Sequence, residues 1–255
     1  MLFSWLKRRR RRRLLAEPFP DEWRDVLAGN VHHYARLSAA DRAKLCDDLR
    51  IVVAEKSWEG CGGLTMTDEV QVTVAAQAAL LLLGFRDEYF DAVRSILVYP
   101  DAYVVPNETT NRAGVVIQGE SAREGEAWHR GPVVLSWSDA LAGGRGHSHG
   151  NLVVHEFAHQ LDMRNGEADG IPAMASREQY RRWEHVTRAA FRQLRHDCRH
   201  GEPTLLDCYG TKNRSEFFAV ASETFFQHPR ELADLHRDLY DALAEFYHQD
   251  PARWR

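Results

Sequence analysis

The residues with the clearest chemical potential are two histidines and a glutamate in the segment His155-Glu156-Phe157-Ala158-His159. On a helix, residues four positions apart lie one turn apart on the same face, so His155 and His159 can bind one metal ion. Glu156 can then reach a water molecule on that ion. The H-E-x-x-H pattern therefore predicts a zinc site with a carboxylate base. The alternative is a core helix whose histidines bond only to backbone groups.

A catalytic zinc site usually takes three protein ligands, so a third donor must come from elsewhere in the chain. The longer pattern H-E-x-x-H-x-x-G-x-x-H is excluded, because Asp162 and Asn165 stand at its glycine and its last histidine. The other source is a glutamate on a later helix, and Glu216 and Glu223 lie in an otherwise apolar stretch. A buried acid is costly unless it is paired or metal-bound. The two are seven residues apart on one helix face, so spacing alone leaves both open.

Two separate motifs give the chain a resemblance to a known family. The first is HEFAHQLD at 155–162, and the second is YGTKNRSEFFA at 209–219. Together they resemble the MtfA (Mlc titration factor A) family of bacterial zinc peptidases, and they are similar to the catalytic domain of anthrax lethal factor. The resemblance to the MtfA family extends over most of the chain after the N-terminal tail, including 71–78 and 131–137.

This resemblance implies a role for each matching residue. Glu156 would act as the general base, and Tyr209 would donate a hydrogen bond to the oxyanion beside the open coordination position. The spacing from Tyr209 to Glu216 is the most specific element of the motif, and it makes Glu216 the third ligand. One Zn²⁺ per chain would then be bound by three residues: His155, His159 and Glu216.

The chain departs from the lethal-factor pattern at one position. That pattern has a second acid four residues after the ligand glutamate, and the residue here is Val220. A carboxylate that accepts a hydrogen bond from a metal-binding imidazole normally fixes the orientation of the ring. The group that orients the histidines of this chain is therefore left open between Glu223 and Asp162.

The resemblance also carries two expectations about activity. It implies aminopeptidase-like hydrolysis of small peptides, and it implies binding of Mlc, a repressor of glucose-uptake genes. The alternative to a peptidase is thus a repressor-binding module whose zinc domain is mainly a scaffold. A substrate peptide could add to a sheet edge supplied by residues 114–118 or 132–137.

The elements that must position these residues are predicted as helices around a few strands, which is the α+β class. Apolar spacing and capping residues predict a helical segment over 21–59, with a break near 37–41. They also predict helices over 68–83, 151–163, 177–196, 216–226 and 231–247. Short β-rich runs predict strands at 96–100, 103–105, 114–118 and 132–137, and glycines predict a loop over 143–150.

The length and composition fit one folded domain rather than a fibrous or wholly disordered chain. The chain has 255 residues, of which 44% are hydrophobic and 27% charged. We expect a zincin-like metallopeptidase domain with a small sheet over residues 20–255. Its N-terminal helical part would cover about 20–90, and its catalytic core about 91–255.

The N-terminal tail carries a strong local charge. Seven of the 33 basic residues lie at 7–13, so the rest of the chain has 26 basic and 37 acidic residues, a net charge of −11. Such a body does not attract nucleic acid. We expect residues 1–19 to be a disordered tail. The alternative is weak contact of the 7–13 run with an anionic membrane, helped by Phe3 and Trp5. The longest apolar run, 72–85, is too short to span a bilayer.

The cysteines and the remaining histidines suggest no second site. Four cysteines without a C-x-x-C pair predict four reduced thiols and a cytoplasmic protein: Cys46, Cys61, Cys198 and Cys208. Cys208 is expected to be a small buried side chain. The loop histidines His147 and His149 are expected to be solvated rather than metal-bound. His32 and His33 are expected at the surface.

Overall fold

The structure is a computed structural model that describes residues 2–101 and 131–255. Over these residues the chain is mostly helical and contains one three-stranded sheet, which confirms the α+β expectation. The strands expected at 103–105 and 114–118 lie outside the described residues. Along the part of the chain that the structure describes, no helix is both long enough and apolar enough to cross a membrane.

The sheet consists of three parallel strands in the order β1-β2-β3. They are β1 (Ser57–Gly60), β2 (Ser95–Tyr99) and β3 (Val133–Ser136). The central strand β2 buries Ile96 and Val98 completely, as alternation along a half-buried strand predicts. The prediction of helix up to residue 59 is wrong at its end, because the chain leaves the helix at Lys56 and pairs with β2 instead.

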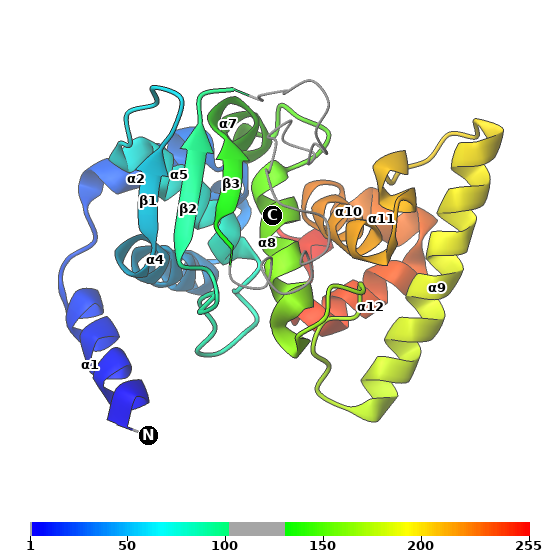
Figure 1. Ribbon diagram of the computed structural model, residues 1–255, viewed down its shortest axis with the longest axis horizontal. Helices are drawn as coiled ribbons and strands as arrows, with labels where there is room; N and C mark the ends of the chain where they lie inside the picture. The colour runs from blue at the N-terminus through cyan, green and yellow to red at the C-terminus, as the bar shows by residue number, and fades with distance from the viewer. Residues whose placement is uncertain (1, 102–130) are drawn as a thin grey trace.

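Helices of the first third of the chain pack behind this sheet (Figure 1). Their bounds are α2 (Asp21–Asn30), α3 (His32–Arg36), α4 (Ala39–Glu55) and α5 (Asp68–Leu80). Side-chain caps start two of them, since Ser38 accepts a hydrogen bond from the Asp41 amide and Thr67 accepts one from the Val70 amide. The apolar helix α5 is buried on nearly all sides and contributes residues to both hydrophobic clusters, so it connects the two.

The second half of the chain supplies the helices around the H-E-x-x-H segment. They are α7 (Trp137–Arg145), α8 (Leu152–Asp162), α9 (Arg177–His200), α10 (Arg214–Gln227), α11 (Pro229–Leu235) and α12 (Arg237–Tyr247), with short 3-10 turns η2 (Met163–Asn165), η3 (Cys208–Thr211) and η4 (Pro251–Arg253). Figure 1 shows α8 between the sheet and α10, and its apolar residues belong to the same hydrophobic cluster as those of β3 and α10. The single helix expected over 231–247 is interrupted at His236.

The glycine-rich loop expected over 143–150 is wrong in its first part, because α7 continues to Arg145. Gly144 faces a close neighbour, and a Cβ there would lie 2.5 Å from the carbonyl oxygen of Asn30. The glycine therefore permits close packing inside a helix rather than loosening a loop. Gly146, with φ of 71°, ends the helix in the left-handed conformation.

The N-terminal tail also differs from the expectation of disorder, because helix α1 covers Leu2–Ala16. Lys7 and Arg11 lie one turn apart and form ion pairs with Glu55 and Asp91. These two acids neutralise part of the basic run, which offsets the repulsion that would otherwise oppose a helix.

Two expectations about cysteine and histidine are also wrong. Cys198 at the end of α9 and Cys208 at the start of η3 form a disulfide, and only Cys46 and Cys61 are free thiols. The pairing depends on α9 and η3 meeting in space, which no sequence spacing announces. His33 is buried rather than at the surface, because its Nε2 bonds to the carbonyl oxygen of Phe226 at 3.0 Å.

Candidate metal centre

Helix α8 holds the two histidines of the H-E-x-x-H segment in a fixed orientation. Its N-cap is Asn151, whose side-chain oxygen accepts a hydrogen bond from the Val154 amide at 3.0 Å. Val154 and Phe157 are completely buried on the core side of the helix. Because the core fixes one face of α8, the other face must point at α10.

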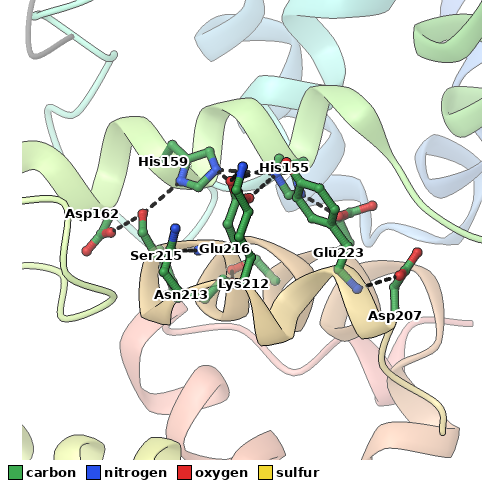
Figure 2. Close-up of polar contacts among 12 residues, drawn as sticks. His155, His159, Asp162, Asp207, Lys212, Asn213, Ser215, Glu216 and Glu223 are labelled. Carbon is green, nitrogen blue, oxygen red and sulfur yellow. Dashed lines mark hydrogen bonds and ion pairs between the residues drawn. The ribbon is translucent and has the colours of Figure 1, made fainter. Parts of the chain in front are cut away.

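Helix α10 brings the acidic residues to the same place. Its N-cap is Asn213, whose side-chain oxygen accepts a hydrogen bond from the Glu216 amide at 2.9 Å. The cap places Glu216 in the first turn, and Glu223 follows two turns later on the same side. Figure 2 shows both glutamates pointing from α10 toward the histidines of α8.

Three side-chain atoms converge between the two helices. Glu216 Oε2 lies 3.0 Å from His155 Nε2 and 3.3 Å from His159 Nε2, and the two Nε2 atoms are 3.2 Å apart. Tetrahedral bonds of about 2.0–2.1 Å from zinc to nitrogen or oxygen would place neighbouring ligand atoms about 3.3–3.4 Å apart. The nitrogen, nitrogen and oxygen donors therefore fit a zinc ion in both chemistry and spacing.

The two histidines use their other ring nitrogen in different ways. His155 Nδ1 donates to Glu223 Oε1 at 2.7 Å, a direct contact with a carboxylate. His159 Nδ1 donates to the Ser215 hydroxyl at 3.0 Å, and this hydroxyl donates to Asp162 Oδ2 at 2.7 Å. Glu223 and Asp162, the two candidates for orienting the histidines, therefore both lie next to the cluster, one behind each histidine. Each contact uses Nδ1 and leaves the Nε2 lone pair free to bind a cation.

The charges of the cluster also favour a cation. Burial lowers the pKa of His155, but hydrogen bonds to Glu216 and Glu223 outweigh it and raise the pKa to about 9. Burial acts to raise the pKa of Glu216, yet its contacts with His155 and His159 hold that pKa well below its usual range. Without a metal, a positive imidazolium therefore balances the carboxylates, and a divalent cation can replace that charge.

Glu156 and Tyr209 border the cluster. Glu156 is half-buried on α8, and burial raises the pKa of its carboxyl although the two neighbouring histidines act in the opposite direction. The Tyr209 hydroxyl, on η3, donates to Glu216 Oε1 at 3.3 Å. A carboxyl with a raised pKa is suited to exchange a proton near neutral pH.

Comparison with known proteins supplies an independent observation. The family described as glucose-regulated metallo-peptidase M90 matches residues 5–248. The chain belongs to the peptidase M90 family.

Named relatives support this assignment. Mlc titration factor A of Serratia proteamaculans is 35% identical over 238 residues, which cover 90% of this chain and 87% of that protein. Mlc titration factor A of Yersinia pestis is 32% identical over 233 residues, covering 90% and 85%. A Synechocystis protein, "Uncharacterized protein slr2042", is 36% identical over 247 residues, covering 95% and 89%. The resemblance to the MtfA family is thus confirmed, and a metallopeptidase family implies a metal.

A buried polar network lies behind the candidate site of this M90 protein, and no sequence motif predicts it. The second oxygen of Glu223, Oε2, accepts a hydrogen bond from the Asn151 backbone amide at 2.7 Å. The Asn151 side chain donates to Gln77 Oε1 at 2.9 Å, and Gln77 donates to the carbonyl oxygens of Thr73 and Ala140. The available signal was a single glutamine inside the apolar run 72–85.

Other polar residues near the M90 site have different roles. Lys212, for which the sequence predicts no role, is exposed, and its Nζ lies 3.8 Å from Glu216 Oε1. His149 lies against His228, with its carbonyl oxygen 3.2 Å from His228 Nε2 and the two ring centroids 4.5 Å apart. Within the described residues, one group of at least three histidine, cysteine or acidic side chains is close enough to hold a metal: His155, His159 and Glu216.

Proposed function

We propose that this M90 protein is a zinc-dependent peptidase with a zincin-like fold. His155, His159 and Glu216 would bind one Zn²⁺. The observation that carries the proposal is the convergence of two Nε2 atoms and one carboxylate oxygen, with separations of 3.0 to 3.3 Å. The M90 family assignment supports it independently.

The residues around the metal have distinct tasks in peptide hydrolysis. Bound zinc supplies Lewis acidity, which lowers the pKa of water and polarises a carbonyl group. Glu156 accepts a proton from the attacking water molecule and returns it to the nitrogen of the leaving amine. Tyr209 donates a hydrogen bond to the oxygen on which negative charge develops, a contact typically worth about 3 kcal/mol.

We further propose aminopeptidase-like action on small peptides, as the family resemblance implies. The substrate would lie along the outer edge of β3, where extended peptides commonly pair with a strand. The 114–118 segment, the other candidate edge, lies outside the described residues.

A second candidate function is binding of an Mlc-type repressor. It is favoured by the name Mlc titration factor A, which belongs to relatives that align with 85–87% of their own length. Such a partner would place the protein in the cytoplasm. Co-sedimentation of the purified chain with purified Mlc tests this role. Absence of a complex would refute it and leave peptidase activity as the one proposed function.

The test of the peptidase combines metal content with activity. We expect about one zinc per chain by elemental mass spectrometry. Glu156→Gln should keep this zinc and lose at least about 100-fold in peptide hydrolysis, because the amide cannot accept the proton. Glu178→Gln, on the exposed side of α9, is the matched control and should keep both. Full activity of Glu156→Gln would refute the mechanism, and absence of zinc uptake would refute the site.

A further inference from the structure

Lys7, Arg11 and Leu14 attach helix α1 to the rest of the molecule. Lys7 Nζ lies 2.6 Å from Asp91 Oδ1, and Arg11 Nη2 lies 2.7 Å from Glu55 Oε2 and 3.0 Å from Asp91 Oδ1. One turn further, Arg50 donates to the carbonyl oxygen of Leu14. Figure 1 shows α1 at the margin of the molecule, beside α4. The inner side is therefore held by polar contacts with α4 and with the segment before β2.

The opposite side of α1 carries cations around an exposed tryptophan. Trp5, Arg9, Arg12 and Arg13 occupy positions i, i+4, i+7 and i+8, which form one helical face, and all four are exposed. The Arg9 guanidinium lies over the Trp5 ring, 5.4 Å from its centroid. We call these four residues the outer face of α1.

The outer face is not needed to attach the helix. Glu55 and Asp91 are engaged by the inner cations Lys7 and Arg11, and the outer arginines add like-charge repulsion along the helix. The rest of the chain outside residues 7–13 has a net charge of −11, from 26 basic and 37 acidic residues, so this run is a strongly cationic segment on an acidic molecule. Such a segment favours a negatively charged partner.

We propose that the outer face of α1 binds the surface of an anionic phospholipid bilayer. Arginines attract lipid phosphates, and tryptophan prefers the boundary between headgroups and acyl chains. Nucleic acid phosphates could attract the same arginines. The bilayer is favoured because Trp5, the 50% exposed aromatic residue of this cationic face, can leave water at the boundary between headgroups and acyl chains. The helix would lie along the surface.

Vesicle sedimentation of the full-length protein tests this proposal. Binding is expected to vesicles of phosphatidylcholine mixed with phosphatidylserine, and to be absent with phosphatidylcholine alone. The triple variant Arg9→Ala, Arg12→Ala, Arg13→Ala should bind about 100-fold more weakly, since each basic residue near an anionic surface contributes roughly one factor of five. Trp5→Ala should also weaken binding, and salt should weaken it for the unmodified chain.

The matched control removes the same charge elsewhere. Arg181, Arg192 and Arg199 are exposed on α9, and their triple alanine variant should bind like the unmodified chain. Equal loss in both triple variants would overturn the proposal, because net charge alone would explain it. Binding of a DNA or RNA oligonucleotide through the outer face, without vesicle binding, would overturn it in favour of nucleic acid. Glu156→Gln should bind vesicles normally, which separates this surface from the proposed peptidase.

Discussion

The two histidines of the proposed zinc site are held by chemically different groups. His155 contacts the Glu223 carboxylate directly, whereas His159 reaches Asp162 through the Ser215 hydroxyl. A direct carboxylate contact is a charge-assisted hydrogen bond and is stronger than one to a neutral hydroxyl. The hydroxyl, however, is the group that links His159 Nδ1 to the buried Asp162. Removing the Ser215 hydroxyl therefore tests most directly whether these contacts orient the zinc ligands.

Ser215→Ala should weaken zinc binding by about 10–100-fold, the usual range for losing a group that orients a metal ligand. The ring of His159 would lose its partner, while Asp162 keeps its hydrogen bond from the Gly170 amide. Competition with a chromophoric chelator measures the affinity.

The control for this variant is Ser222→Ala, another buried serine of α10, whose hydroxyl bonds to the Phe218 carbonyl oxygen and to Tyr247. It should cost folding stability and leave the zinc affinity unchanged. Wild-type zinc affinity in Ser215→Ala would show that the hydroxyl does not orient His159.

Sequence predicts part of this site and not the rest, for a physical reason. His155 and His159 follow from helical periodicity alone, because both lie on one element. The choice between Glu216 and Glu223 needed a family motif, since both face the same side of α10. Ser215 carried no signal, because a hydroxyl in a helix is common and its partner Asp162 is 53 residues away in the chain.

At the scale of elements, η3 is the piece that determines where Tyr209 lies. It is joined to the end of α9 by the disulfide between Cys198 and Cys208, ten residues apart in sequence. The Asp207 carboxylate accepts a hydrogen bond from the Tyr209 amide at 2.8 Å. The segment between α9 and α10 is thus fixed at the residue next to the proposed oxyanion donor.

Replacing both cysteines by serine should lower the free energy of unfolding by about 3 kcal/mol, from the loop entropy of a short cross-link. Peptide hydrolysis should fall as well, because Tyr209 is adjacent to the released Cys208. Urea unfolding monitored by circular dichroism, with and without dithiothreitol, measures the first effect. Cys61→Ser, at a free thiol, is the control. Equal unfolding midpoints for the double variant and the unmodified chain would contradict the disulfide.

Most elements were predictable, including the short strands β2 and β3, but strand β1 was not. The helices containing 151–163 and 177–196 were predicted within a few residues, because their apolar spacing and capping residues are local. Strand β1 has only four residues and follows α4 directly, so nothing in its own sequence interrupts the helical pattern. It is a strand because β2 offers it hydrogen-bond partners, which is tertiary information.

At the scale of the whole molecule, buried polar contacts join the N-terminal helices to the helices of the site. Gln77 of α5 donates to the carbonyl oxygen of Ala140 on α7 and accepts from Asn151 at the start of α8. His33 of α3 bonds to the carbonyl oxygen of Phe226 on α10. Buried hydrogen bonds cost more to break than exposed ones, so these contacts couple the two parts of the chain.

His33 should make the whole molecule sensitive to acid. Burial, with a smaller effect of neighbouring His32, lowers the pKa of His33 to about 3, whereas an unfolded histidine has a pKa of about 6.5. Above pH 6.5 both states are neutral at this ring. As pH falls below that value, only the unfolded state takes up the proton, so the free energy of unfolding falls, by about 2 kcal/mol at pH 5 from this group.

His33→Gln should remove this contribution, because glutamine is neutral at every pH and its amide can still donate to the Phe226 carbonyl oxygen. Urea unfolding at pH 7.5 and pH 5.0, with chelator in all samples, should therefore give a smaller difference for this variant than for the unmodified chain. His185→Gln, on the exposed side of α9, controls for the loss of a histidine and should keep the full difference. If His33→Gln keeps it too, His33 is not the buried neutral group that joins α3 to α10.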